Sequence, residues 1–296
     1  MSFAGFYCEA THPEQPTVLS ADCLACARQG ALPGCALTAP VVKGILKGLR
    51  AEDFGLTVTT LLGCPRKWRL QQTEPYWLKP SEAWWAYRGQ LMHGIAAEYA
   101  RDDYNAIAER RFSLMVGDTE ISGQPDLVLV DRRHLVDYKT TKSVPGPIRT
   151  WTCPETHRVI RQSQFAWRNK WMDCLHCATK RHEAKAIEAL GEPRPYLRHL
   201  QQVSLYRLIL WENGLEVDTA EIVYQDMRQQ LRLPADMLSL ADARTLLEAR
   251  LRLHQQTKLP GILTDSNDVW ECDFCPVRAA CERVHGSPVG KVISHP

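Results

Sequence analysis

A short stretch of alternating residues, with one aspartate near each end, constrains the fold of this chain more than any other feature. Residues 125–139 read Pro-Asp-Leu-Val-Leu-Val, then a turn-prone Asp-Arg-Arg, then His-Leu-Val-Asp-Tyr-Lys. Two short β-rich runs joined by a tight turn predict a β-hairpin. Successive side chains of a strand point to opposite faces, so Asp137 and Lys139 leave the same face of the predicted sheet. Asp126 lies near that end of the sheet if the two strands pair antiparallel.

These side chains have the chemistry of a metal-dependent hydrolase. Two carboxylates could hold a hard cation such as Mg²⁺ or Mn²⁺ through oxygen ligands. A neighbouring lysine could position or deprotonate a water and stabilise charge on a phosphate. On these residues alone a plainer interpretation stays open, in which the aspartates belong to a turn and Lys139 forms a solvated salt bridge.

Further polar residues lie on predicted helices on either side of the hairpin. His93 falls in a predicted helix over 86–108 and could supply a third metal ligand. Gln202 and Tyr206 are four residues apart in a predicted helix over 197–212, so they share one face. Near the ends of the core lie Cys64, in a predicted helix over 57–72, and a Cys-x₂-Cys-x₅-Cys motif formed by Cys272, Cys275 and Cys281.

Together and in this order, these motifs resemble the RecB-type nucleases of the PD-(D/E)XK superfamily. The similarity is greatest to the branch closed by an iron–sulfur cluster, which includes CRISPR-associated adaptation exonucleases and AddB-type nuclease domains. It covers residues 55–145 and 198–285. The fold it implies is an α/β, restriction-endonuclease-like core with a central mixed sheet flanked by helices.

The resemblance also assigns roles to individual residues. It implies a metal site formed by His93, Asp126, Asp137, the backbone carbonyl of Tyr138 and the catalytic Lys139. It implies substrate contacts from Gln202 and Tyr206, to which the basic Arg66 and Lys67 are candidate additions. It implies a [4Fe–4S] cluster on Cys64, Cys272, Cys275 and Cys281, although thiolate spacing alone would equally suit zinc.

The remaining cysteines indicate two zinc sites. Eleven cysteines in a chain without a secretion signal favour metal ligation over disulfides. Cys-x₂-Cys pairs let a tight turn aim two sulfurs at one tetrahedral ion. For any isolated cysteine, a buried free thiol remains the alternative. The predicted zinc ligands are Cys8, Cys23, Cys26 and Cys35 in one group, and Cys153, Cys174 and Cys177 with His157 or His182 in the other.

Boundary signals divide the chain. A cysteine-rich segment, resembling a zinc ribbon, is expected over residues 1–50, and the nuclease core over 51–296. Proline-rich triplets at 145–147 and 193–195 delimit an insertion over 146–196 that contains the second zinc group. This insertion is predicted to be a metal-pinned lid or DNA guide, with a protein-docking module as the alternative.

Composition limits the partners. A net charge of +2 means that any nucleic-acid surface is local, for example at Arg66 and Lys67. No run has the length of a transmembrane helix and Met1–Glu14 lacks a signal-peptide pattern, so a cytoplasmic protein is expected. No Walker-type loop is present, which assigns any helicase action to a partner.

The expected function is therefore a Mg²⁺- or Mn²⁺-dependent DNA exonuclease acting on a single-stranded end. Repair, recombination, CRISPR adaptation and phage-related processing are all compatible with the motifs, and the oligomeric state is open. Two alternatives remain: a non-catalytic nucleic-acid-binding subunit, and a protein adaptor that uses the nuclease fold and zinc modules as scaffold.

Overall fold

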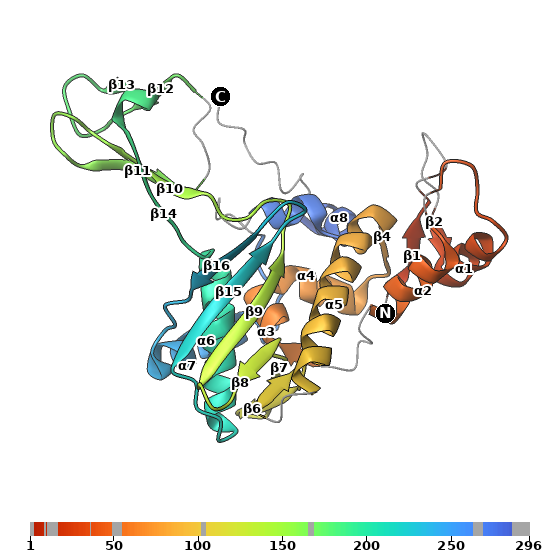
Figure 1. Ribbon diagram of the computed structural model, residues 1–296. Helices are drawn as coiled ribbons and strands as arrows, with labels where there is room; N and C mark the ends of the chain where they lie inside the picture. Colours follow the sequence, from red (N-terminus) through yellow and green to blue (C-terminus); the bar gives the residue numbers. More distant parts are fainter. Residues whose placement is uncertain are drawn as a thin grey trace.

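The computed structural model of the chain describes residues 3–8, 10, 17–35, 37–48, 55–101, 105–164, 169–262 and 269–285. Their fold is α/β, with a mixed central sheet and helices on both of its faces (Figure 1). Among these residues no helix combines the length and apolarity that crossing a bilayer requires.

The central sheet has five strands in the order β16–β15–β9–β8–β5. β9 (His134–Thr140) and β15 (Thr219–Gln225) are parallel, and every other neighbouring pair is antiparallel. The predicted hairpin is β8 (Leu127–Leu129) with β9, in a register that sets Leu127 opposite Val136. This register brings Asp126, just before β8, beside Asp137. The outer strands are β5 (Ala106–Ala108) and β16 (Gln230–Pro234).

The two faces of this sheet are covered by different helices (Figure 1). α5 (Pro80–Arg101) packs on one face, where Ala100 meets Val136 and Val223. α6 (Leu197–Glu212) packs on the other, backed by α3 (Val58–Leu62) and α7 (Leu240–His254). Because side chains of β9 alternate, Leu135 and Asp137 point to the α6 face.

The main hydrophobic core lies between the sheet and α6. Leu135, Ile222, Leu205 and Leu208 are each at most 1% exposed there. Burying one such side chain contributes about 1.5–3 kcal/mol. A large core of this kind holds α6 and β9 firmly, which fixes the side chains that these elements carry toward one another.

A second sheet, in the order β3–β7–β6, leads into the hairpin. It consists of β3 (Leu56–Thr57), β6 (Phe112–Val116) and β7 (Thr119–Gly123). At the end of β7, Gly123 lies so close to α6 that a Cβ there would meet the ring of Tyr206 at 2.9 Å. Gly123, three residues before Asp126, therefore permits this close packing because it has no side chain.

The prediction of a single helix over residues 57–72 was wrong. The chain forms α3 and then α4 (Pro65–Thr73), separated at Gly63 and Cys64. Thr57 caps α3 through its hydroxyl, which accepts from the amide of Thr60 at 3.1 Å. Cys64 is the N-cap of α4, and Pro65 occupies the first turn, where its missing N–H costs nothing.

The helix predicted over 86–108 also differs from the structure. α5 begins earlier, at Pro80, and ends at Arg101. Ala106–Ala108 instead form β5 and pair with β8. An Ala-Ile-Ala sequence is compatible with either structure, and pairing with the sheet decides between them.

The predicted insertion forms an arm that projects from one end of the central sheet (Figure 1). It leaves after β9 and returns directly to α6. Its strands form a three-stranded sheet, β11–β10–β14, and a separate hairpin, β12–β13. They are β10 (Pro147–Thr152), β11 (Val159–Ser163), β12 (Trp171–Asp173), β13 (Arg181–Glu183) and β14 (Glu188–Pro193), with the 3₁₀ turn η1 (Ala184–Ile187) before β14.

The N-terminal residues pack beside α5 with a small core of their own, formed by Phe6, Val42, Ile45 and Ala83. Their elements are β1 (Phe3–Tyr7), β2 (Thr17–Leu19), α1 (Ser20–Arg28) and α2 (Ala39–Gly48). β1 also pairs with β4 (Tyr76–Leu78), which ties this segment to later residues. At the other end of the chain, η2 (Val269–Phe274) precedes α8 (Arg278–His285), which contacts α4.

Candidate metal centre and cysteine sites

Three side chains from separate elements converge at the start of β8. The Nδ1 atom of His93, on α5, lies 2.9 Å from Oδ1 of Asp126 and 3.0 Å from Oε1 of Glu109. One ligand atom from each residue lies within 4.8 Å of the other two. Two carboxylates and an imidazole at this spacing could hold a divalent cation.

The backbone of β9 fixes the orientation of Asp126. The amide of Tyr138 donates to Oδ2 of Asp126 at 2.6 Å, which leaves Oδ1 directed at His93. Asp126 is only 3% exposed. The aspartate of the Gly-Gln-Pro-Asp motif is thus held by the very strand that carries Asp137 and Lys139.

Glu109 is a member of this cluster that the sequence analysis missed. Its Oε2 accepts a hydrogen bond from Nε2 of Gln124 at 2.5 Å, and Gln124 in turn accepts from Arg111 at 3.2 Å. The backbone of Glu109 is left-handed, with φ of 52°. Such a conformation costs free energy in a non-glycine residue and often occurs at functional sites. A lone glutamate before a strand carries no sequence signal for either property.

The electrostatics of His93 reflect its two acidic neighbours. Burial alone would lower its pKa, but hydrogen bonds and charge from Asp126 and Glu109 raise it to about 10. The two carboxylates therefore stabilise a positive charge at this position, and they would stabilise a bound cation in the same way.

Asp137 and Lys139 form a buried ion pair beside this cluster. Nζ of Lys139 lies 2.5 Å from Oδ2 of Asp137, which is fully buried. Apart from this ion pair, neither oxygen of Asp137 has a hydrogen-bond partner among the described residues. Asp137 lies outside the three-residue group, but its charge interacts with both Asp126 and His93. A buried carboxylate with unused acceptor capacity is a suitable additional cation ligand.

Burial and charge determine the protonation of this pair. Burial raises the pKa of Asp137 to about 6, although the charge of Lys139 opposes the increase. Burial alone would lower the pKa of Lys139, but Asp137, Asp126 and Tyr206 raise it to about 12. Lys139 is therefore a cation at neutral pH.

α6 brings the predicted Gln202 and Tyr206 to the same region. Nε2 of Gln202 donates to the hydroxyl of Tyr206 at 2.8 Å. Tyr206 is 5% exposed, and its burial raises the pKa to about 12, so the phenol is neutral. Its hydroxyl accepts from Gln202 and can donate its own hydrogen to another acceptor.

The four cysteines predicted to bind a cluster line one pocket, although they come from distant parts of the sequence. Cys64 lies at the start of α4, while Cys272, Cys275 and Cys281 lie in η2, α8 and the turn between them. The amide of Lys67 donates to Sγ of Cys64 at 3.4 Å. Burial raises the pKa of Cys275 to about 11. Unlike the acidic cluster, these four sulfurs are not among the described groups whose ligand atoms all lie within 4.8 Å.

Arg66, a predicted substrate contact, lies in the lining of the cysteine pocket. It is 7% exposed, with Nε donating to Sγ of Cys281 at 3.0 Å and Nη1 to the carbonyl of Pro260 at 2.9 Å. Its guanidinium therefore joins α8 and the segment at Pro260 to α4. Lys67 lines the same pocket.

The pocket is connected to α6 by an ion pair. Glu271, next to Cys272, pairs with Arg198 in the first turn of α6. Arg198 lies two helical turns before Tyr206, so a charged contact links the cysteine pocket to the helix that carries Gln202 and Tyr206.

Cys153, Cys174, Cys177 and His182 meet in the arm, with one ligand atom from each within 4.8 Å of the others. This cluster could hold a metal ion. The second histidine proposed for it, His157, lies exposed on the turn between β10 and β11.

The N-terminal cysteines are less closely grouped. Burial raises the pKa of Cys23 to about 11, with added contributions from Cys35, Cys26 and Cys8. The four thiols therefore lie near one another. They do not form a group with ligand atoms within 4.8 Å in the described part of the chain.

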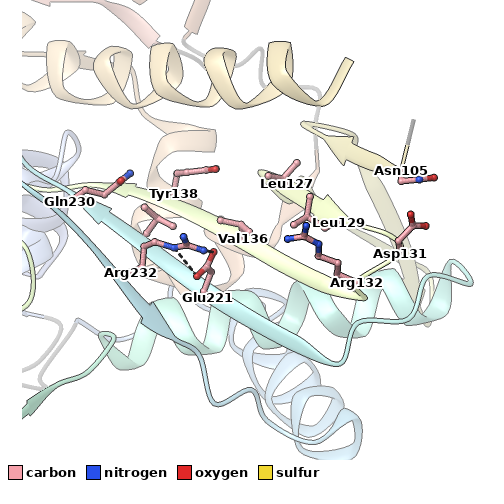
Figure 2. A pocket seen from close by; sticks show the side chains of 11 residues that line it. Asn105, Leu127, Leu129, Asp131, Arg132, Val136, Tyr138, Glu221, Gln230 and Arg232 are labelled. Atoms are coloured by element: carbon pink, nitrogen blue, oxygen red, sulfur yellow. Dashed lines mark hydrogen bonds and ion pairs between the residues drawn. The ribbon is translucent and has the colours of Figure 1, made fainter. Parts of the chain in front are cut away.

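A cavity of about 380 Å³ lies over the face of β9 that carries Val136 and Tyr138 (Figure 2). Asp137, which lies between these two residues in the strand, points to the other face. The floor of the cavity is formed by Leu127, Val136 and Tyr138, and the ion pair between Arg232 and Glu221 lies at its edge. It includes no carboxylate of the acidic cluster. We therefore place the candidate metal centre at the start of β8 and not in this cavity.

The chain matches no family model and no curated protein. Nine chains of solved structures match it. One of them, described as "Crystal structure of SSO0001", is 18% identical, with a TM-score of 0.47 over 81% of this chain and 93% of that chain. Likeness at this level identifies neither a fold family nor an activity.

Proposed function

We propose that this chain is a metal-dependent nuclease with the restriction-endonuclease-like core of the RecB-type PD-(D/E)XK superfamily. Its reaction is hydrolysis of phosphodiester bonds in DNA, and its mode is exonucleolytic. One observation carries the proposal: His93, Glu109 and Asp126 converge beside a buried Asp137–Lys139 pair. Carboxylates, an imidazole and a lysine are the groups that cation-assisted phosphate chemistry requires.

The donor set fits Mg²⁺ or Mn²⁺. His93, Glu109, Asp126 and Asp137 would hold the cation, together with the carbonyl of Tyr138. Asp137 is well suited to bind a cation, because its two buried oxygens accept no hydrogen bond from the described residues beyond the contact with Lys139. When bound, the cation would acidify a water and polarise the phosphate.

Lys139 acts in this proposal as a fixed positive charge. A pKa raised to about 12 keeps the ammonium protonated at neutral pH, so it stabilises negative charge on the phosphate and does not accept a proton. The ion pair with Asp137 holds the ammonium in place before substrate binds.

Tyr206 and Gln202 position the substrate. The amide of Gln202 orients the phenol, whose hydrogen is then directed to a phosphate or base oxygen. Gly123 maintains this placement because it lets α6 approach the end of β7.

A [4Fe–4S] cluster is the proposed occupant of the pocket formed by Cys64, Cys272, Cys275 and Cys281. Four thiols around one pocket, spread wider than a single-ion group, fit a cluster in which each iron takes one thiolate. Joining α4 to the C-terminal helix restricts a long loop of the unfolded chain, worth on the order of 4–5 kcal/mol. Zn²⁺ is the proposed metal of the arm and takes no part in this chemistry.

DNA with a single-stranded end is the proposed substrate, in a cytoplasmic repair, recombination or CRISPR-adaptation process. A helicase or another protein would supply strand separation, since the chain contains no Walker-type loop.

The decisive test is cleavage of end-labelled single- and double-stranded DNA by anaerobically purified protein with Mg²⁺ or Mn²⁺. Metal-dependent cleavage is expected, with a loss of at least about 10³-fold in Lys139→Ala. The matched control is Lys258→Ala, which removes an exposed lysine after α7 and should cleave at the wild-type rate.

Two results would overturn the proposal. Equal cleavage by wild type and Lys139→Ala would assign the activity to a contaminant or to another site. A folded wild-type protein that retains its iron–sulfur cluster and zinc, and that binds DNA without cleaving it, would favour a non-catalytic nucleic-acid-binding subunit. If it also binds no DNA, the adaptor alternative gains support.

A further inference from the structure

The described residues of the arm, 147–164 and 169–193, form a core too small to be stable through packing alone. Its core consists of Trp151, Met172 and Ala184, with Ile160 and Ile187 partly buried against them. Other apolar side chains of the arm face outward, among them Leu175, which is 97% exposed. Units of this size without a larger core are usually stabilised by a disulfide or a metal.

The cysteine–histidine tetrad lies next to this small core. Cys153 follows β10, Cys174 and Cys177 lie between β12 and β13, and His182 lies in β13. Sγ of Cys153 and Sγ of Cys177 lie 3.7 and 3.1 Å from Nε2 of His182. Zn–S bonds of about 2.3 Å and Zn–N bonds of about 2.0 Å place tetrahedral ligand atoms about 3.5–3.8 Å apart.

The backbone of two turns supports this arrangement. His157 and Lys180 both have left-handed backbones, with φ of 56° and 58°. The amide of Cys174 donates to the carbonyl of Lys180 at 2.7 Å, and that of His176 donates to Sγ of Cys174 at 3.3 Å. The β12–β13 turn therefore directs its two cysteines inward and supplies an amide donor to one sulfur.

We propose that Cys153, Cys174, Cys177 and His182 bind one Zn²⁺, and that this ion replaces a hydrophobic core in the arm. Three thiolates and one imidazole form a closed structural zinc site. The close spacing excludes the larger iron–sulfur cluster, in which each thiolate binds a different iron. Cys153 follows β10 of the three-stranded sheet of the arm, and the other three ligands come from the β12–β13 hairpin. The ion would join these two parts, so folding of the arm is coupled to zinc binding.

The geometry also selects between the two candidate histidines. His182 is 8% exposed and directed at two of the sulfurs, while the side chain of His157 is exposed. His157 contributes through its backbone, whose amide donates to the carbonyl of Cys153 at 2.8 Å. His157 is therefore the matched control for His182.

The test measures the zinc content of full-length protein by mass spectrometry, together with hydrogen exchange by peptide. Cys174→Ser should lose one zinc per chain and exchange at least about tenfold faster in residues 147–163 and 171–193. Exchange in α6 should not change. His157→Ala should retain zinc and wild-type exchange, because its side chain is exposed.

A second measurement keeps the proposal falsifiable if Cys174→Ser does not fold. Co²⁺-substituted wild type and His182→Cys should both give the intense visible bands of a tetrahedral thiolate site, with a shift toward a four-thiolate spectrum in the variant. Identical spectra would exclude His182 as a ligand. Unchanged zinc content and arm exchange in a folded Cys174→Ser protein would overturn the proposal. None of these measurements depends on nuclease activity.

Discussion

The acidic cluster and the arm tetrad could each hold a metal ion, but different forces assemble them. The acidic cluster lies where a large hydrophobic core fixes β9 and α6, and its side chains are oriented by hydrogen bonds such as that from Tyr138 to Asp126. The arm tetrad lies beside a small apolar core of three buried residues in the described part of the arm. Ligands in the first site are positioned by packing, whereas those of the second depend on the ion.

If the proposed functions hold, this difference separates a catalytic role of the acidic cluster from a folding role of the arm tetrad. Preorganised ligands cost little to bring together, so a cation at the acidic cluster adds chemistry more than stability. Ligands on a poorly packed arm gain their arrangement from the metal, so that site contributes folding free energy. Removing a ligand should therefore abolish cleavage at one site and unfold a segment at the other.

The largest expected effect is at Asp126. Asp126→Asn keeps an oxygen for the amide of Tyr138 but removes the charge that faces His93. We expect cleavage to fall by at least about 10³-fold, equivalent to about 4 kcal/mol in the barrier. The free energy of unfolding should fall by about 1–3 kcal/mol, the cost of leaving His93 without one of its partners, and the fold should persist because the packing is intact.

The control for this variant is Asp118→Asn, in the exposed turn between β6 and β7. It should leave the rate of cleavage unchanged. If Asp126→Asn instead unfolds the protein at ordinary temperature, the acidic cluster is not held by packing and the contrast with the arm is lost.

Core truncations should distinguish the two regions next. Leu208, on α6, is 1% exposed, so Leu208→Ala should lower the free energy of global unfolding by about 2–5 kcal/mol. Trp151, in the arm, is also fully buried. Trp151→Ala should accelerate hydrogen exchange in the arm without lowering the denaturant midpoint of the core. A common midpoint shift in both variants would mean that arm and core unfold as one unit.

A buried histidine on α6 gives the core a pH dependence of its own. Burial, with help from Lys139 and Arg198, lowers the pKa of His199 to about 3, and its Nδ1 lies 2.9 Å from the hydroxyl of Tyr224. In the unfolded chain His199 is protonated below about pH 6.5, whereas in the folded chain it stays neutral down to about pH 3. The contribution of His199 is thus fully present above about pH 6.5 and is lost as the pH falls toward about 3, by up to about 1.4 kcal/mol per pH unit.

His199→Gln should remove this dependence. Denaturant unfolding of the variant at about pH 7 and about pH 5 should give a difference smaller than that of the wild type by up to about 2 kcal/mol. His157→Gln, on the exposed arm turn, should show the wild-type difference. An unchanged pH dependence in His199→Gln would mean that His199 is protonated in the folded protein.

Local patterns made much of the core predictable. Alternation over residues 125–139 predicted the β8–β9 hairpin, and helical periodicity predicted α6 with its observed bounds, Leu197–Glu212. Gly63 and Pro65 flank the break between α3 and α4, so a helix boundary there could have been expected from the residues themselves.

Other features depend on tertiary contacts. Glu109 joins the cluster through a left-handed backbone and a hydrogen bond from Gln124, neither of which has a sequence pattern. Spacing suited His157 and His182 equally, and the fold separates them by burying His182 close to two of the sulfurs. Arg66 has the appearance of a substrate ligand in the sequence, but its partners, Cys281 and Pro260, are distant in the chain.

Two glycines of the core should respond to substitution in opposite directions. A Cβ at Gly123 would lie 2.9 Å from the ring of Tyr206, so Gly123→Ala should destabilise the fold by about 1–3 kcal/mol. Gly94 is exposed on α5, and a Cβ added there would meet no atom within 4 Å, so Gly94→Ala should stabilise the helix by up to about 1 kcal/mol. Denaturant unfolding measures both.

Because Gly123→Ala displaces Tyr206, it should also reduce cleavage more than its stability loss explains at a temperature where it is fully folded. Equal stability changes of the same sign would show that α6 can shift at Gly123, and that packing does not hold Tyr206 in place.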